Sequence, residues 1–285
     1  MPRRQKHLIT AEDLYHIEIL SEPRLSPDGR RVVYSQQRVD PRTEKKYSNL
    51  WLAPAQGGNP QQFTRGDQND TSPRWSPDGT QIAFLSDRGV SEKPAQLYLI
   101  PMSGGEARRI IEIPGSIEEF SWSPDGSQLV CAVQKTDEEV LEREKDENKK
   151  KLGTVFRQYD RLFYKLDGSG YLPKERTHLW TVDVRQGKAR QITDHPVRDE
   201  KNPAWSPDGK WIAFISNHAE KPDLAFECLE VFVMPAAGGE ARALPAPVGE
   251  KMLPSFSPDG RWIAYYGTEG KLEVYRNQGL WIVPA

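Results

Sequence analysis

Long hydrophobic runs are missing from this 285-residue sequence. No stretch approaches the roughly 18 consecutive apolar residues of a membrane-spanning helix, and the basic N-terminus MPRRQKHLITAED contains no apolar segment of the kind that a secretory signal requires. Cysteine is scarce as well. Cys131 and Cys228 lie in separate apolar segments, are too few for a disulfide framework, and are typical of buried free thiols. We therefore expect no membrane contact and a cytoplasmic location.

An excess of positive charge is also missing. The 39 Lys and Arg residues are balanced by 41 Asp and Glu residues, for a net charge of −2, so nucleic-acid binding is not expected. The five His residues show no ligand spacing, and the acidic run at 67–70 lacks the Gly and Glu of a calcium loop. Neither a G-x-S-x-G nor a Walker, G-x-G-x-x-G or H-E-x-x-H motif occurs. We expect no metal, no cofactor and no catalytic residue in this chain.

A repeat is what the sequence does contain. The tetrapeptide Ser-Pro-Asp-Gly recurs about every 50 residues, a period typical of propeller blades, with about 33 extra residues inside the third repeat. Each copy lies among four short runs rich in Val, Ile, Trp, Tyr and Phe, such as RVVYS and NLWLAP in the first repeat. Runs of this kind predict four-stranded antiparallel blades, and hence an all-β propeller. The copies begin at Ser26, Ser76, Ser123, Ser206 and Ser257.

The tetrapeptide is interpreted as a tight turn between the first two strands of each blade. Pro presets φ at the first corner, Asp suits the second, and Gly adopts the left-handed conformation that follows. Turn chemistry thus explains the five acidic residues without a catalytic or metal site: Asp28, Asp78, Asp125, Asp208 and Asp259.

The repeats also predict the domain organisation. Four have all four strands, whereas the fifth stops after its third run, GLWIVP. We expect a single propeller domain over 1–285, with four full blades and most of a fifth, truncated from a larger, seven-bladed ring. The strand Gly279–Pro284 would then have an open edge, which should promote self-association.

Residues 1–21 precede the first repeat and are expected to form an N-terminal helical segment. The run TAEDLYHIEIL predicts a short helix with Thr10 as its N-cap. Leu14, Ile17 and Leu20 would form an apolar stripe that packs on the first blade or on a neighbouring domain.

Residues 135–178 form an insert in the third repeat. Its first part, Lys135–Leu152, is densely charged and predicts a solvated helix. Its second part, at 155–168, mixes aromatic residues with Arg, a composition that suits interfaces and ligand contacts. The candidate residues are Arg157, Tyr159, Asp160, Arg161 and Tyr164.

The arrangement resembles the prolyl oligopeptidase family of serine peptidases, in particular its acylaminoacyl-peptidase branch. The resemblance spans essentially the whole chain and depends on the N-terminal ITAEDLYHIEILSEPRLSPDGRRVVYS and the insert VFRQYDRLFYKLDGSGYLPKERTHLWTVDV, because TolB-type propellers share the Ser-Pro-Asp-Gly repeat alone. It implies a propeller that caps a following α/β-hydrolase domain, which carries a Ser-Asp-His triad and is reached only by short peptides. Nothing in this chain matches the hydrolase part. Glu118-Glu119 lies closer to a turn than the amine-binding pair of the dipeptidyl-peptidase branch, so that role is not transferred.

On this resemblance the chain is expected to be a non-catalytic N-terminal propeller, with short peptides and a C-terminal α/β-hydrolase domain as its partners. The alternative is a TolB-like or free-standing propeller that acts as a protein-interaction scaffold. Two interpretations of the insert stay open. Arg157, Tyr159, Asp160, Arg161 and Tyr164 line the substrate route or the domain interface, or the Arg and Asp residues form a structural network that braces the insert.

Overall fold

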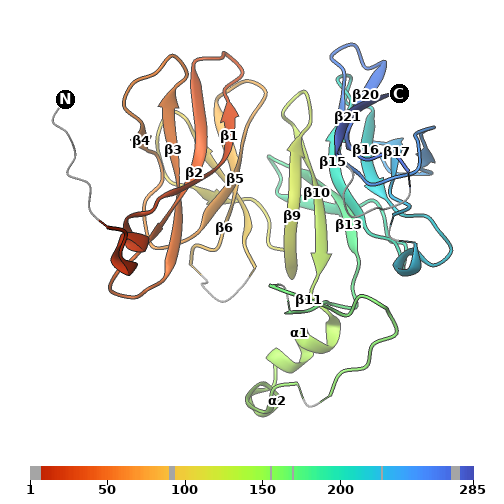
Figure 1. The fold of residues 1–285 in the computed structure, drawn as a ribbon, viewed down its shortest axis with the longest axis horizontal. Helices are drawn as coiled ribbons and strands as arrows, with labels where there is room; N and C mark the ends of the chain where they lie inside the picture. The colour runs from red at the N-terminus through yellow and green to blue at the C-terminus, as the bar shows by residue number, and fades with distance from the viewer. Residues whose placement is uncertain (1–7, 90–93, 155, 169, 226, 271–276) are drawn as a thin grey trace. The chain divides into compact units, whose positions relative to one another are not determined.

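The computed structural model describes residues 8–89, 94–154, 156–168, 170–225, 227–270 and 277–285, which form two compact units, Met1–Arg109 and Ile110–Ala285 (Figure 1). Strands account for 44% of the structure and helices for 8%, so the predicted all-β class is confirmed. The first unit holds two four-stranded antiparallel sheets. The first sheet is β1 (Ile19–Leu25), β2 (Arg31–Val39), β3 (Lys46–Pro54) and β4 (Gln61–Gln62); the second sheet is β5 (Asp70–Trp75), β6 (Gln81–Ser86), β7 (Gln96–Pro101) and β8 (Arg108–Arg109).

The second unit holds three further antiparallel sheets. The third sheet is β9 (Gly115–Trp122), β10 (Gln128–Lys135), β13 (Thr177–Asp183) and β14 (Lys188–Gln191); the fourth is β15 (Glu200–Trp205), β16 (Trp211–Ser216), β17 (Glu230–Pro235) and β18 (Arg242–Ala243); the fifth is β19 (Lys251–Phe256), β20 (Trp262–Gly267) and β21 (Gly279–Pro284). Strands follow one another across each sheet in chain order. Four strands in four sheets and three in the fifth is the predicted arrangement.

Neighbouring sheets within each unit pack face to face, which is why the central strands are apolar on both sides. β6 is buried over five of its six residues. In the first unit Val33 and Leu50 of the first sheet join Phe84 of the second in one core cluster. Phe214 of the fourth sheet belongs to a cluster with the third sheet, and Ile263 of the fifth to a cluster with the fourth. Burial of both faces replaces strict polar alternation with continuous hydrophobic runs.

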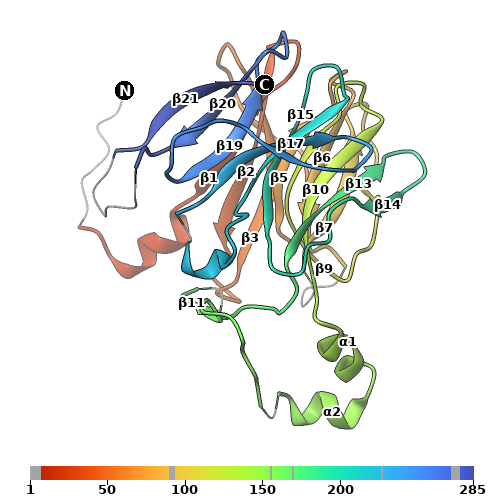
Figure 2. The same cartoon turned by 90° about the vertical axis from the view of Figure 1, so that its right-hand side faces the viewer.

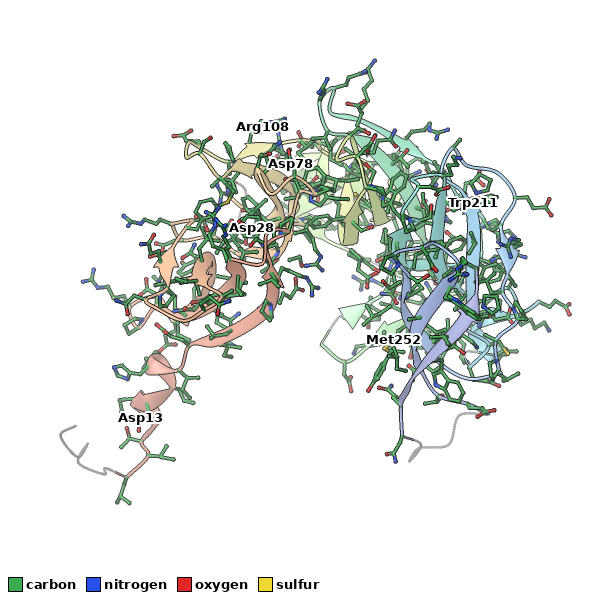
Figure 3. All side chains as sticks on the ribbon, turned by 90° about the horizontal axis from the view of Figure 1, so that it is seen from above. Asp13, Asp28, Asp78, Arg108, Trp211 and Met252 are labelled. Atoms are coloured by element: carbon green, nitrogen blue, oxygen red, sulfur yellow. The ribbon has the colours of Figure 1, made fainter. Side chains whose placement is uncertain are left out.

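The Ser-Pro-Asp-Gly turns have one geometry in all five copies, and Figure 3 labels Asp28 and Asp78 at two of them. The Ser hydroxyl donates to the carboxylate two residues on at 2.5–2.6 Å. The Gly N–H donates to the Ser carbonyl at 2.8–2.9 Å, with the Gly φ between 69° and 71°. The Ser hydroxyl is the largest cause that lowers the pKa of each Asp. The interpretation of these Asp residues as turn residues is confirmed.

A β-bulge recurs in the first strand of all five sheets, and in four of them it contains a residue with a positive φ. The register of these four strands shifts, and the residue at each shift has a φ of 50–53°: Glu22, Ser72, Asn202 and Leu253. A bulge leaves one residue outside the strand ladder. In the fourth and fifth sheets, the N–H of the positive-φ residue donates to a side chain of the preceding sheet. Asn202 N–H donates to Glu119 Oε2 at 2.6 Å, and Leu253 N–H donates to Asn202 Oδ1 at 3.1 Å.

The N-terminal segment differs from the prediction. Within residues 8–21, the part of this segment that the structure describes, only η1 (Ala11–His16) is helical, as a 3-10 turn, and β1 begins at Ile19. The expected apolar stripe is therefore wrong: Leu14, Ile17 and Leu20 are 63%, 52% and 61% exposed. The reason lies in the run IEIL, whose alternation fits a strand, and pairing of Ile19 with Gln37 of β2 extends the sheet instead of the helix.

The insert contains α1 (Glu138–Glu144), α2 (Glu147–Leu152) and the short hairpin β11 (Lys165–Leu166) and β12 (Gly170–Tyr171), and Figure 2 shows the helices beyond the end of β10 and β13. Neither helix buries a residue, as expected for a solvated segment. The predicted single helix is divided because the Asp146 carboxylate caps α2, accepting from Asn148 and Lys149 N–H at 2.9 and 3.1 Å. Val155, within the predicted aromatic segment, lies outside the described residues.

Candidate functional site of the insert

The insert leaves and re-enters the third sheet at one place. β10 and β13 are adjacent, and Gln134 pairs with Thr177, so residues 136–176 span two neighbouring strand ends. Asp137 ties the two ends together, because its carboxylate accepts from the N–H groups of Lys174 and Glu175 at 2.8 and 3.0 Å. The blade needs only a tight turn here. The insert is thus an addition fixed at its base, not a part of the strand framework.

Two of the candidate residues contact Tyr171, which sequence reasoning missed, and Tyr164 joins the cluster through Tyr159. The Tyr159 ring stacks on Tyr171 at 5.8 Å and meets Tyr164 at 5.1 Å. The guanidinium of Arg157 lies over the Tyr171 ring at 4.3 Å, and Lys165 Nζ lies at 5.3 Å. Tyr164 and Tyr171 stay 47% and 49% exposed. The cluster presents aromatic faces and cations to solvent, a combination that suits contact with a peptide or a protein surface.

Arg161 points elsewhere, towards the fourth sheet. Its side chain is 13% exposed, its Nε lies 3.6 Å from Asp223 Oδ2, and one Nη donates to the Pro173 carbonyl at 3.4 Å. Asp223 belongs to η2 (Pro222–Leu224), between β16 and β17. Arg176 contacts the same carboxylate at 3.5 Å and Asp199 at 3.1 Å. A chain of alternating charge therefore links the insert to the loop of the next sheet. The sequence gives little indication of this link, because Asp223 lies far from the insert and no recognisable spacing relates it to Arg161.

Asp160 lies outside this chain of charges. Its residue is exposed, and its charge is the least of the causes that raise the pKa of Lys174, after the contact of Lys174 Nζ with Glu139 at 3.0 Å. The insert thus separates its candidates into an exposed aromatic and cationic cluster, a partly buried Arg161, and an outlying Asp160.

A cavity of about 300 Å³ lies beside Arg161 in the second unit. Its wall combines charged and apolar side chains, with Met252 on the wall labelled in Figure 3. Its lining residues include Arg161, Phe163, Arg176, Lys201, Asp223 and Lys251. Convergent charges and an apolar surface in one recess are typical of small-molecule sites.

Glu118 and Glu119 do not act as a pair. Both Glu119 oxygens are used by Asn202, whose N–H and side-chain amide donate at 2.6 and 2.5 Å. Glu118 instead accepts from the Thr177 hydroxyl at 3.5 Å. Since one carboxylate is held by a bulge of the next sheet, this geometry gives no support to a shared amine site.

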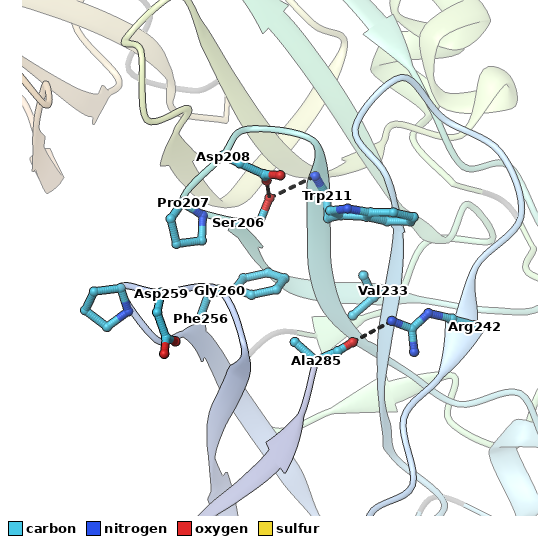
Figure 4. A pocket seen from close by; sticks show the side chains of 11 residues that line it. Ser206, Pro207, Asp208, Trp211, Val233, Arg242, Phe256, Asp259, Gly260 and Ala285 are labelled. Carbon is cyan, nitrogen blue, oxygen red and sulfur yellow. Dashed lines mark hydrogen bonds between the residues drawn. The ribbon is translucent and has the colours of Figure 1, made fainter.

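A second cavity, of about 450 Å³, lies between the turns of the fourth and fifth sheets (Figure 4). Its polar groups are already bonded. Ser206 Oγ donates to Asp208 and accepts from Trp211 N–H at 2.9 Å, and Arg242 donates to the Ala285 carbonyl at 2.5 Å. The turn chemistry uses these groups, so the cavity offers little for a ligand to bind.

The part of the chain that the structure describes contains neither a metal cluster nor a membrane-spanning helix. No three His, Cys, Asp or Glu side chains there are grouped so that they would hold a metal ion. None of the described helices has the length and apolar character needed to cross a membrane.

The chain is similar to propeller portions of known proteins. The family model of the TolB beta propeller domain matches residues 15–157. The uncharacterized peptidase YuxL of Bacillus subtilis is 36% identical over 80% of this chain and 34% of its own length, and dipeptidyl-peptidase 5 of Porphyromonas gingivalis is 27% identical over 92% and 39%. Acylaminoacyl peptidase of Pyrococcus horikoshii superposes with a TM-score of 0.70 at 22% identity, over 94% of this chain and 39% of that one. A putative TolB of Agrobacterium tumefaciens superposes with a TM-score of 0.59 at 17% identity, over 93% and 76%.

The chain thus spans little more than a third of the length of the curated relatives that it matches. These matches confirm the resemblance to the propeller portion of prolyl oligopeptidase-family peptidases. The family model covers half of the sequence, and the chain belongs to the TolB β-propeller domain family.

Proposed function

We propose that this chain is the non-catalytic propeller of an acylaminoacyl-peptidase-like serine peptidase and restricts access of peptides to a following α/β-hydrolase domain. The observation that carries the proposal is the match to a relative named as a peptidase, at 36% identity over 80% of this chain but only 34% of that relative. A propeller accounts for the matched third, and hydrolysis belongs to a remainder that supplies an activated nucleophile, a base and an oxyanion hole.

The insert supplies the contact surface in this proposal. It is an added loop fixed by Asp137 on a rigid sheet, and such loops carry function more often than the framework does. The exposed Arg157 and Tyr164, with the half-buried Tyr159 between them, meet the peptide or the hydrolase domain. Arg161 serves two purposes, because it braces the insert through Asp223 and also lines the adjoining cavity.

Deletion of the insert tests the gating role. In the complete gene product, residues 136–176 are replaced by a short Asn-Gly turn, which the adjacent ends of β10 and β13 accommodate. We expect the kcat/KM for a long peptide to rise about tenfold relative to that for an acyl-dipeptide anilide. The matched control removes only α1 and α2, which bury no residue, and should leave the ratio unchanged. An unchanged ratio in the full deletion contradicts gating by the insert.

Two single substitutions separate contact from bracing. Arg157→Ala should lower peptide turnover with little loss of stability, since its side chain is exposed over Tyr171. Arg161→Ala should cost about 2 kcal/mol of unfolding free energy, because its partly buried charged contacts are lost. If both variants keep full turnover and lose only melting temperature, both residues are structural and the proposed contact role is wrong.

A second function is favoured by the TolB family match and by the TolB structure, of which this chain covers 76%. On that alternative the chain is a protein-interaction scaffold. The two functions differ in what the complete gene encodes. A hydrolase domain with a G-x-S-x-G motif after this segment supports the first, and its absence supports the second.

A further inference from the structure

A buried charge recurs at one position of the repeat, six residues before the Ser of three turns. Asp70, Glu200 and Lys251 occupy it and are 0%, 3% and 2% exposed. The first two have ionic or hydrogen-bonding side-chain partners. Asp70 binds Arg88 Nη2 with both oxygens at 2.7 Å, and Glu200 contacts His178 Nδ1 at 2.8 Å. The repeat therefore tolerates a buried charge here when a side chain compensates it.

Lys251 lacks such compensation among the described residues. Its Nζ donates to the backbone carbonyls of Leu229 and Gly249, at 2.9 and 3.2 Å. Among the described residues no carboxylate forms an ion pair with it, and the charge of Glu230 acts on it only from a longer distance. Burial is the main cause that lowers the pKa of Lys251, and the charge of Glu230 opposes it without reversing it. A buried ammonium without a directly paired carboxylate is costly to folding. An ammonium has three donors, and two carbonyls leave one of them for a further acceptor.

A second donor on the same cavity is also incompletely used. Arg161 Nε is buried without a hydrogen-bond partner, since Asp223 Oδ2 at 3.6 Å is too distant to accept. Arg161 comes from the insert and Lys251 from β19, yet both line the cavity of about 300 Å³. Two cationic donors without full acceptors in one recess point to an oxygen-bearing anion.

The other charges around the cavity leave Lys251 without an ion pair and Arg161 Nε with a single long one, to Asp223 at 3.6 Å. The carboxylates of Asp199 and Asp223 are held by Arg176 at 3.1 and 3.5 Å. Glu250 accepts from the Gln278 amide at 3.4 Å. Lys201 adds a further cation to the wall, and Phe163 and Met252 add apolar surface. The recess thus combines cationic donors with room for an apolar side chain.

We propose that this cavity binds the C-terminal carboxylate of a short peptide, with Lys251 Nζ and Arg161 Nε as donors and Phe163 and Met252 against the terminal side chain. A volume near the lower limit of ligand sites, about 300 Å³, suits one or two residues of peptide. The inference rests on the proposed handling of short peptides and adds a preference for a free carboxyl end.

Calorimetry on the 285-residue chain tests this with N-acetyl-Ala-Phe and its C-terminal amide. The acid should bind about tenfold more tightly than the amide, a difference of about 1.4 kcal/mol. Lys251→Met and Arg161→Gln should each remove most of that preference. Lys210→Met, which changes an exposed lysine on a turn, is the matched control and should keep it. Equal binding of acid and amide by the wild type overturns the proposal, as does an undiminished preference in Lys251→Met and Arg161→Gln.

Melting temperatures distinguish a ligand-binding role of Lys251 from a structural one. Lys251→Met removes an uncompensated buried charge and should melt at the same temperature or higher, which a structural lysine would not allow. If this variant fails to fold, Arg161→Gln decides the question alone. The gating proposal is tested separately, by the ratio of long to short peptide turnover, so a failure of carboxylate binding leaves that result intact.

Discussion

Removal of the Asp70 carboxylate is expected to destabilise the first unit by about 3 kcal/mol. Asp70 is fully buried and accepts from Arg88 Nη2 with both oxygens at 2.7 Å and from Ser86 Oγ at 2.6 Å. Asp70→Ala strands the guanidinium beside an apolar core. This interaction is therefore the strongest single polar contribution that we expect in the second sheet.

The loss of unfolding free energy depends on which charged group each substitution leaves without its partner. Removing one member of a buried ion pair costs about 3–5 kcal/mol. Arg88 is 25% exposed and lies over the Phe84 and Tyr98 rings at 5.1 and 5.3 Å, so after Asp70→Ala it is partly compensated by water and aromatic faces. Arg88→Ala leaves a carboxylate with no exposure, and we place its cost at the upper end, about 5 kcal/mol.

Hydrogen–deuterium exchange of peptides from β5–β7, combined with urea denaturation, measures both costs within the first unit. The matched control is the ion pair of Arg38 and Asp67, which has a similar distance of 2.6 Å but side chains that are 40% and 65% exposed. Arg38→Ala should cost less than about 1 kcal/mol. If Asp70→Ala costs no more than Arg38→Ala, or if Arg88→Ala costs less than Asp70→Ala, the burial argument is refuted.

Three further outcomes are expected. The hydrogen bond from Ser257 is the main cause that lowers the pKa of Asp259 to about 2. The ionised Asp259 therefore stabilises the fold above its ordinary pKa, and this stability is lost as the pH falls through about 2. Ser257→Ala should reduce the fall in melting temperature between about pH 5 and pH 2. Gly115→Ala should cost more than about 3 kcal/mol in urea denaturation, because its Cβ would lie 2.2 Å from a backbone oxygen, whereas Gly153→Ala, with open space around it, should cost about 1 kcal/mol. Leu280→Lys, at a residue of β21 that is 77% exposed, should lower self-association in light scattering, and undiminished scattering would argue against an adhesive edge.

The fold was predictable because its signals are local. A turn such as Ser76–Gly79 contains its own acceptor, donor and left-handed Gly, and β6 has four consecutive apolar residues between Gln81 and Ser86. The N-terminal segment was harder, since the run at 17–20 suits a strand only when β2 is there to pair with it. Sequence pattern reports local preference, and tertiary pairing overrides it where the two disagree.

The candidate site was less predictable because its contacts join distant segments. The partner of Arg161 is Asp223, from a loop of the next sheet, and not the adjacent Asp160. Tyr171 joins the aromatic cluster through a hairpin whose two strands have only two residues each. Lys251 looks in the sequence like a surface lysine near a turn. Only the packing of β19 shows that it is buried.

Repetition within the chain separates residues that serve folding from residues that do not. The five turns repeat one set of bonds, so their Asp residues need no other explanation. The insert interrupts the repeat, and Lys251 departs from it because, within the described chain, its buried charge has only backbone carbonyls as hydrogen-bond partners. A residue that breaks a local sequence–structure rule without stabilising the fold is typical of functional positions. Because Arg161 of the insert and Lys251 of β19 line one cavity, the two departures are best explained by a single ligand.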